Sequence, residues 1–198
     1  MGIDRALDEL ICPGMRRVIQ VSVKSLIDSE YLELLGISEI GNMTVDLGLN
    51  DEESNVIAQP QEVKIVFAEN VPMFEADGTE VFNSNGIRVI SKGIVEEPEE
   101  YLDYVNMILL VENELDEKVR FNVKYNSLSL NGFMMDEMSD PRDVLAGKVA
   151  FIDVSVRMED LKDNGITAIE DIIEAEFGIE VQNDNYDMLA ESMLKISY

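Results

Sequence analysis

The stretch Arg17-Val18-Ile19-Gln20-Val21-Ser22-Val23 returns later in the chain as Ala150-Phe151-Ile152-Asp153-Val154-Ser155-Val156. In both copies apolar and polar residues alternate, which is typical of a β-strand with one buried and one solvated face. The similarity continues downstream at an offset of about 129 to 133 residues, and a constant offset of this length predicts arrayed modules. We expect the alternating apolar residues of both copies to face inward: Ile19, Val21, Val23, Ile152, Val154 and Val156.

Two further pairs of segments follow in the same order. A second alternating run ends at Leu47-Gly48-Leu49 in the first copy and at Phe177-Gly178-Ile179 in the second. A short apolar strand then closes each copy, at residues 63–67 and 194–198. The apolar residues keep the same parity in both copies, so we expect antiparallel strands with one buried face.

A connector in each copy differs from the strands around it. Residues 25–35 and 158–164 have apolar side chains three and four positions apart, and a glycine follows each segment. This pattern predicts a short helix with glycine just beyond its C-terminal cap.

Residues 79–147 have no counterpart in the first copy. Residues 102–111 are apolar at both odd and even positions, which predicts a central strand covered on both sides. The apolar parity then changes, so we expect a β-bulge or a change of sheet near Asn126-Ser127. With turn pairs such as Asn131-Gly132, the second copy reads as about seven short strands.

These elements predict an all-β fold, an antiparallel immunoglobulin-like β-sandwich repeat. Residues 68–198 supply a complete sandwich, and residues 1–67 supply only the C-terminal half of one. The missing half would lie upstream in a longer parent chain or have been lost. The apolar face of the first copy must still be covered, because a sheet of two or three strands is marginal alone. We favour cover by a second copy of the protein, giving a homodimer, over folding back onto the second repeat.

The chain is strongly acidic, with a formal net charge of −26 at pH 7 over 198 residues. Such a surface repels the phosphates of nucleic acids and anionic lipid headgroups. No apolar run is long enough to span a bilayer, and the acidic start of the chain as given does not resemble a secretory leader. We therefore expect no nucleic-acid partner and no direct membrane insertion of this chain.

Histidine and tryptophan are absent, and Cys12 is the single cysteine. An intrachain disulfide, a Cys/His zinc site and histidine-based catalysis are therefore excluded. We interpret Cys12, in Leu10-Ile11-Cys12-Pro13-Gly14, as a small apolar residue near a turn. No residue is assigned a catalytic, cofactor-binding or metal-binding role, and no cofactor is expected.

Short motifs of the second copy carry a family resemblance. They are Asn85-Gly86-Ile87-Arg88-Val89, Val111-Glu112-Asn113, Leu130-Asn131-Gly132-Phe133-Met134 and Ala146-Gly147-Lys148, with the connector at residues 160–169. Together they resemble the immunoglobulin-like repeats of uncharacterised secreted or membrane-anchored proteins of anaerobic Gram-positive gut bacteria. The resemblance implies an extracellular or cell-envelope β-sandwich with no assigned activity.

One acidic cluster has the composition of a calcium loop. Glu75, Asp77 and Glu80 place carboxylates around Gly78. The segment lacks the regular ligand spacing and the closing bidentate glutamate of an EF-hand. We interpret it as an acidic turn and predict no tight calcium site, with these three residues as the first ligands to test.

Two polar loops fall at the same place in both copies, at residues 50–55 and 183–187. Loops at one end of a sandwich often carry function, but a hairpin tip that tolerates polar residues explains them equally well. Pairs of carboxylates could in principle hydrolyse glycosides, although nothing among 41 acidic residues marks one pair out.

Aromatic and methionine side chains offer two further surfaces. Tyr101, Tyr104, Tyr125 and Phe133 could line a sugar platform, although we interpret most of them as core. Three methionines could form an adaptable contact patch, although loop packing over an open sandwich edge is the preferred interpretation. They are Met134, Met135 and Met138.

These observations favour a non-enzymatic module that serves as a spacer or a protein-interaction domain at the cell envelope. Its partner would be another protein or a surface glycan. The first alternative is a carbohydrate-binding or calcium-dependent adhesion module, which would need an exposed aromatic row or an ordered acidic cage. The second alternative is an acidic hydrolase, which would need a concave site with perturbed carboxylates.

Overall fold

The computed structural model describes residues 42–51, 53, 55–66, 77–98 and 103–198. The described residues belong to two compact units, a hairpin between residues 42 and 66 and a sandwich between residues 77 and 198.

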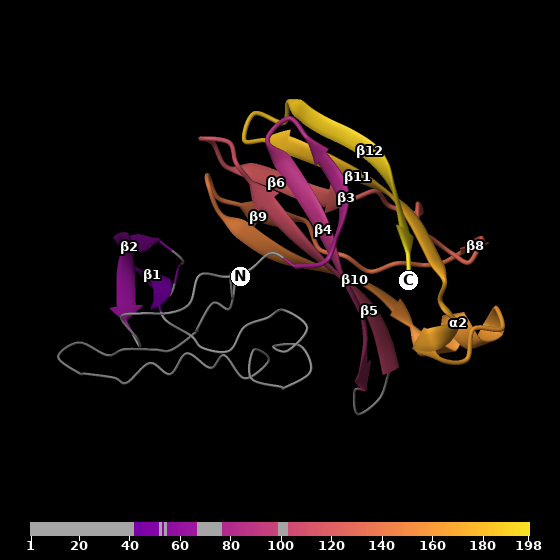
Figure 1. Cartoon of the computed structure of the whole chain (residues 1–198). Helices are drawn as coiled ribbons and strands as arrows, with labels where there is room; N and C mark the ends of the chain where they lie inside the picture. Colours follow the sequence, from indigo (N-terminus) through magenta and orange to yellow (C-terminus); the bar gives the residue numbers. More distant parts are fainter. Residues whose placement is uncertain (1–41, 52, 54, 67–76, 99–102) are drawn as a thin grey trace. The chain divides into compact units, whose positions relative to one another are not determined.

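Two antiparallel sheets form the sandwich (Figure 1). The first sheet has the strand order β10-β5-β4-β3. Its strands are β3 (Thr79–Ser84), β4 (Ile87–Pro98), β5 (Asp103–Asn113) and β10 (Val149–Arg157). In the second sheet β11 pairs with β12 along one edge and with β6 and β7 along the other. β9 pairs with β6, and β8 pairs with β7. Its strands are β6 (Val119–Val123), β7 (Ser129–Leu130), β8 (Phe133–Met134), β9 (Arg142–Val144), β11 (Glu174–Asn183) and β12 (Met188–Ser197).

The crossovers are those of an immunoglobulin-like sandwich. β5 lies beside β10, as strands B and E do, while β6, β11 and β12 are neighbours, as strands C, F and G are. β4 takes the place of strand A, and β3 adds one strand beyond it. β9 pairs with β6 instead of joining the first sheet as strand D. The predicted all-β, immunoglobulin-like sandwich is confirmed.

The core lies between the two sheets and consists of alternate residues from each strand. Ile152, Val154 and Val156 of β10 are at most 2% exposed, so their predicted inward orientation is confirmed. Burying a side chain of this size contributes about 1.5–3 kcal/mol to folding. The corresponding residues of the first copy lie outside the described residues: Ile19, Val21 and Val23.

The predicted central strand is also confirmed. β5 lies between β4 and β10, and every residue from Val105 to Val111 is at most 2% exposed. Its odd-numbered residues from Val105 to Val111 belong to the core between the sheets. Ile108 and Leu110 alternate with them and so point to the other face of the sheet. Apolar residues at both parities are what a strand buried on both faces requires.

The predicted change of parity is a bulge between β6 and β7. Both strands pair with β11, so they are two halves of one interrupted strand. Val123 before the interruption and Leu128 after it are both buried, and Asn126 between them has a left-handed φ of 55°. Asparagine is one of the few residues that adopt this conformation readily.

Gly178 of β11 makes room for this bulge. Lys124 N–H donates to the Gly178 carbonyl at 2.8 Å, and Gly178 N–H donates to the Ser127 hydroxyl at 3.0 Å. A Cβ on Gly178 would come within 2.7 Å of Lys124 Cδ and 3.2 Å of Lys124 Cβ. The glycine therefore lets the bulged chain run close to β11.

The predicted connector helix of the second copy is α2 (Met158–Asp163). Gly165, with φ of 81°, donates to the Lys162 carbonyl, and Ile166 donates to the Leu161 carbonyl, both at 3.0 Å. This is a Schellman motif, and Leu161 and Ile166 add its apolar contact because both are buried in the core. A short 3₁₀ turn, η2 (Ile169–Asp171), follows. Residues 25–35 of the first copy lie outside the described residues.

The hairpin unit consists of β1 (Asn42–Asn50) and β2 (Val56–Val66), which pair in antiparallel fashion. β11 begins 132 residues after β1, and β12 begins 132 residues after β2. β2 has one extra residue near Pro60, where the pairing with β1 shifts. The domain boundaries at residues 1–67 and 68–198 stay a prediction.

One detail of the sequence alignment is wrong. At an offset of 132 residues Leu47 corresponds to Ile179, so Gly48 does not correspond to Gly178. The two glycines favoured an alignment that is displaced by two residues. A displacement of two keeps every side chain on its face, so the predicted parity still holds.

Candidate functional site

Asn113 anchors the loops at one end of the sandwich. It ends β5, is 2% exposed, and its side-chain amide makes hydrogen bonds to the backbone of several other residues. Its amide nitrogen donates to the carbonyls of Glu117 and Val144, both at 2.9 Å, and its amide oxygen accepts from Leu115 N–H at 3.0 Å. A buried amide with its hydrogen bonds made fixes the loops it joins.

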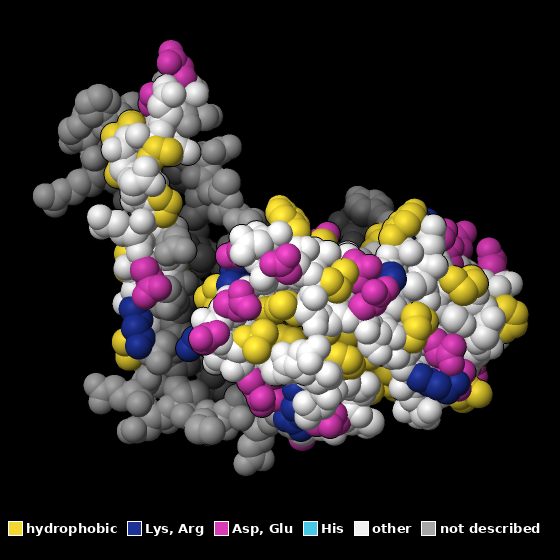
Figure 2. All heavy atoms as spheres, turned by 90° about the horizontal axis from the view of Figure 1, so that it is seen from above, with side chains coloured by type: hydrophobic (Ala, Val, Ile, Leu, Met, Phe, Trp, Pro, Cys, Tyr) yellow, Lys and Arg dark blue, Asp and Glu magenta, His cyan; other side chains and the backbone are white. Residues whose placement is uncertain are grey.

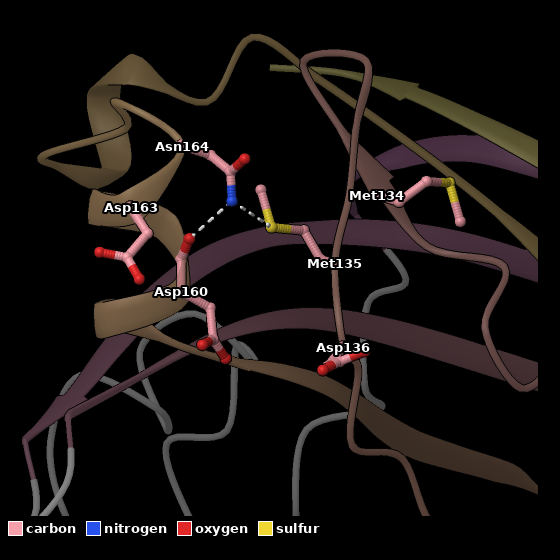
Figure 3. A pocket seen from close by; sticks show the side chains of 6 residues that line it. All are labelled: Met134, Met135, Asp136, Asp160, Asp163 and Asn164. Atoms are coloured by element: carbon pink, nitrogen blue, oxygen red, sulfur yellow. Dashed lines mark hydrogen bonds between the residues drawn. The ribbon is translucent and has the colours of Figure 1, made fainter.

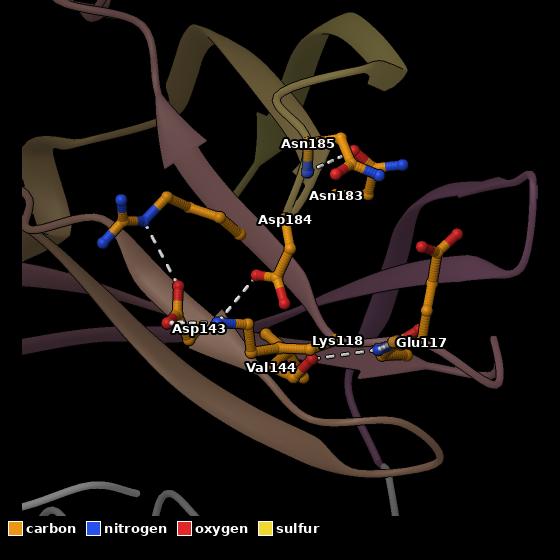
Figure 4. Close-up of polar contacts among 9 residues, drawn as sticks. Glu117, Lys118, Asp143, Val144, Asn183, Asp184 and Asn185 are labelled. Carbon is orange, nitrogen blue, oxygen red and sulfur yellow. Dashed lines mark hydrogen bonds and ion pairs between the residues drawn. The ribbon is translucent and has the colours of Figure 1, made fainter.

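An ion-pair cluster lies at the same end of the sandwich (Figure 4). Lys118, just before β6, lies 2.7 Å from Asp184 in the β11–β12 turn and 3.3 Å from Asp143 in β9. Arg120 Nε lies 3.2 Å from the other oxygen of Asp143. The hydrogen bond to Asp184, followed by that to Asp143, raises the pKa of Lys118. The carboxylate of the 183–187 loop is therefore used to join strands.

The suspected calcium loop is engaged in a similar way. Glu75 lies outside the described residues. Asp77 pairs with Lys92 of β4, and Glu80 of β3 lies 2.6 Å from Arg88 Nε. Hydrogen bonds from these cations lower the pKa of Asp77 and of Glu80, so both stay charged. Among the residues that the structure describes, no group of three or more Asp, Glu or Cys side chains is placed to hold a metal ion.

The two hairpin tips have the same hydrogen bonds with the residue types exchanged. Asp51 Oδ1 accepts from the backbone N–H of residues 53 and 55, and Asn183 Oδ1 accepts from those of residues 185 and 187. The side chain of Asn55 donates to Asp51 Oδ2 at 3.0 Å, and that of Asn183 donates to Asp187 Oδ2 at 3.3 Å. Each tip thus contains one amide and one carboxylate, in opposite order. The polar loops at residues 50–55 and 183–187 are matched turns.

A shallow hollow of about 180 Å³ lies between α2 and the loop after β8 (Figure 3). Asn164 at its rim donates to the Asp160 carbonyl at 2.9 Å and lies 4.0 Å from the sulfur of Met135. Three carboxylates line the hollow, with Met134, Met135 and Asn164: Asp136, Asp160 and Asp163. The hollow is small and open, unlike the enclosed apolar pockets that hold small-molecule ligands.

The outer face of the second sheet is covered by ion pairs. Lys195 lies 2.7 Å from Glu174 and 2.6 Å from Glu176, and Lys124 lies 2.5 Å from Glu191. Hydrogen bonds to these carboxylates raise the pKa of both lysines. On the visible side of the sandwich, acidic and basic side chains are interspersed (Figure 2). This is a solvated surface rather than a single charged patch.

The aromatic candidates divide. Tyr101 lies outside the described residues, and Tyr104 of β5 is half-buried. Tyr125, in the bulge after β6, is 84% exposed, and Phe133 of β8 is 46% exposed. The interpretation of these rings as core is therefore wrong for Tyr125 and Phe133, because the bulge and the β7–β8 turn carry them outward.

The methionine segment runs along the edge of the first sheet. Met138 exchanges two backbone hydrogen bonds of 2.8 Å with Ser155 of β10. Met135 is buried in the core, and Met134 and Met138 are exposed. The loop therefore packs over an open sandwich edge, as preferred, and leaves two methionines at the surface.

No protein-family model matches the chain, and no curated protein matches it. Among solved structures, the chain is similar in part to the crystal structure of a FixG-related protein from Vibrio parahaemolyticus, with 10% identity. That alignment covers 57% of this chain and 95% of the other, with a TM-score of 0.29, which is too low to bear on function.

The sequence did not predict the roles of several residues that hold the loops and strands together. Asn113 stands only inside a quoted motif, and Asn131 only in a motif and as part of a turn pair, with no role for either side chain. Asn131 Oδ1 accepts from the backbone of Ile173 at 2.9 Å, and its Nδ2 donates to the Asp171 carbonyl at 2.8 Å. The signal was an asparagine at a strand end in each motif, since this side chain readily satisfies nearby backbone groups. The ion pairs of Lys118 had no signal, because their partners are far apart in sequence.

Proposed function

We propose that the chain is a non-enzymatic β-sandwich module that serves as a spacer or protein-interaction domain outside the cell, at the envelope. The observation that carries this proposal is the structural use of the motif residues. Asn113 and Asn131 each hold backbone groups of another segment, and Asn85 donates to the Leu189 carbonyl at 2.8 Å. Residues that build turns maintain a scaffold that can be repeated along a chain.

The internal repeat supports the same proposal. The β1–β2 hairpin reproduces the strand starts and turn bonds of β11–β12. Arrays of small sandwich modules separate or display other domains, because each module is folded by its own core.

The state of the carboxylates also fits a scaffold. Four described carboxyls have shifted pKa values, and each shift is downward: Asp51, Asp77, Glu80 and Asp171. A general acid at neutral pH needs a raised pKa, which hydrogen bonds to the charged form oppose. In the described part of the chain, no helix combines the length and apolar character needed to cross a bilayer. The envelope location is proposed from the family resemblance.

The exposed rings of Tyr125 and Phe133 favour one alternative, a glycan-binding module. A glycan array probed with the purified chain, with and without millimolar calcium, separates the two functions. We expect no glycan signal in either condition and no calcium binding in the micromolar range by calorimetry. A glycan signal that is lost in Tyr125→Ala, but kept in the matched variant Tyr186→Ala, would establish the alternative instead.

The location is tested separately. Intact cells that produce the protein are treated briefly with protease, and released peptides are identified by mass spectrometry. We expect peptides from the chain in the released fraction together with those of known surface proteins. Peptides that appear only after lysis would contradict an envelope location.

A further inference from the structure

One apolar sheet face is exposed in the hairpin unit. Side chains alternate between the two faces of a strand, so five apolar residues of β1 and β2 share one side. We name this surface the hairpin face, and it consists of Val45, Leu47, Leu49, Val63 and Ile65. Leu47 is 44% exposed, Leu49 50%, Val63 40% and Ile65 38%. Apolar side chains are visible at the surface of the hairpin in Figure 2.

The equivalent residues of the second copy are buried against another sheet. The hairpin face has five counterparts in β11 and β12, and each of them is at most 1% exposed. They are Phe177, Ile179, Val181, Leu194 and Ile196. In the sandwich they pack in the core against the sheet formed by β10, β5, β4 and β3. The residues of the hairpin face thus correspond to core residues of the second copy, and burying them requires a second apolar sheet face.

We propose that the hairpin face packs against the hairpin face of a second copy of this chain. This proposal rests on the proposed function and names the partner of the interaction module. Two identical sheet faces related by a twofold axis are self-complementary, and stacking them reproduces the sheet-on-sheet packing of the sandwich.

The distribution of charge favours the hairpin face as the surface for self-association. Each copy carries a net charge of −26, so two copies repel each other over most orientations. Glu62 and Lys64 flank Val63 in β2 and therefore point to the opposite side of the hairpin. The hairpin face has no charged residue, so stacking buries no unpaired charge.

The sandwich offers a poorer surface for the same purpose. The outer face of β11 and β12 carries four glutamates, of which Glu180 and Glu191 share Lys124. Pairing that face with itself would bring the remaining negative charges together.

The size of the hairpin face sets the strength of the contact. Five side chains on two strands bury less than the ~1,200–2,000 Å² of a standard stable interface. The dimer should therefore be reversible, with dissociation at micromolar or higher concentration. Added salt should strengthen it, because salt screens the repulsion of the two copies and does not weaken apolar burial.

The test is sedimentation velocity of the full chain from 5 to 300 µM, at low and at high salt. We expect a shift from the 22.3 kDa monomer towards twice that mass as concentration and salt rise. Leu47→Glu should weaken the association at least about tenfold. The matched control is Val66→Glu, which places the same charge on the opposite side of β2 and should leave association within about twofold.

Hydrogen exchange of the wild type tests the contact directly, without a variant that could unfold the hairpin. In the wild type, peptides covering residues 42–66 should gain protection with concentration, and peptides covering 174–197 should not. A monomer at all concentrations, or dimerisation that Leu47→Glu leaves intact, overturns the proposal. Concentration-independent protection of residues 42–66 in a monomer overturns it in favour of cover within the chain. None of these results bears on the glycan and surface tests above, so the two proposals fail separately.

Discussion

Single asparagines carry much of the architecture at the scale of the residue. Asn85, Asn126 and Asn131 have φ values of 53°, 55° and 51°, in the left-handed region that most residues avoid. Asn85 and Asn131 also use their side chains on the backbone of distant segments. One residue type thus supplies both the turn conformation and the hydrogen bonds that hold it.

Asn113 is more deeply buried than Asn85, Asn126 or Asn131. We expect Asn113→Ala to lower the free energy of unfolding by about 2 kcal/mol, because the carbonyl of Val144 loses a donor in a buried site. Urea unfolding followed by circular dichroism measures the loss. Asn122→Ala on the partly exposed face of β6 is the control and should change stability by less than about 0.5 kcal/mol. Equal effects of the two variants would contradict the anchoring role.

Asp171 gives a residue-scale prediction for pH. Hydrogen bonds from the backbone and hydroxyl of Thr167 and from the backbone of Ala168 lower its pKa. A carboxyl with a lowered folded-state pKa stabilises the fold above its ordinary value of about 4, and this contribution is lost as the pH falls through the folded-state pKa.

Asp171→Ala should therefore be less stable than the wild type at pH 7, and the difference should shrink as the pH is lowered from 5 towards 2. Urea unfolding at each pH measures it. Ile173→Ala, at a non-titrating position that is 65% exposed, is the control and should show a constant difference. A difference for Asp171→Ala that does not change with pH would show that the carboxylate is not the stabilising group.

The two hairpins are the informative pair at the scale of the element. Their tips use one amide and one carboxylate in opposite order, around the same backbone bonds. A tip with two carboxylates should lose the side-chain hydrogen bond and gain a repulsion.

Exchange variants of the second tip test this reading. Asn183→Asp should lower the free energy of unfolding by about 0.5–1 kcal/mol, because it faces Asp187. Adding Asp187→Asn should restore it, since the double variant has the arrangement of Asp51 and Asn55 in the first tip. Thermal unfolding of the single and double variants completes the cycle. Failure of the second change to rescue the first would mean that the two tips are not equivalent.

At the scale of the whole molecule, the buried apolar side chains among the described residues lie in the sandwich. Equivalent residues of the two hairpins have different surroundings, as Leu47 is 44% exposed and Ile179 is 0% exposed. Removing the same kind of side chain should therefore have unequal consequences.

Ile179→Ala should destabilise the chain by about 2–5 kcal/mol, because it leaves a cavity in the core. Leu47→Ala, its matched counterpart, should change stability by less than about 0.5 kcal/mol at low micromolar concentration. Calorimetric unfolding of both variants at one concentration checks this. A large loss in the dilute Leu47→Ala variant would show that the hairpin face is already covered in the monomer.

The sequence by itself determined the fold class, the parity of the strands and the connector helix. Alternation in β10 and in β11 identified their buried faces, and Gly165 marked the end of α2. These features are local, since they depend on neighbouring residues and on the two-residue and 3.6-residue periods. The parity change at Asn126 was equally local, and it correctly indicated the bulge.

Only the tertiary structure decided the register of the repeat and the fate of the candidate site residues. The glycines misaligned the two hairpins by two residues, because such a displacement leaves the apolar pattern unchanged. Asp77, Glu80 and Asp184 were potential ligands in the sequence, and each is paired with a cation brought to it by the fold. Ile179 is buried because the sheet of β10, β5, β4 and β3 packs against its side of β11, whereas Leu47 at the equivalent position of β1 is 44% exposed. Pairing and cover are set by residues far apart in the chain, so no local pattern can specify them.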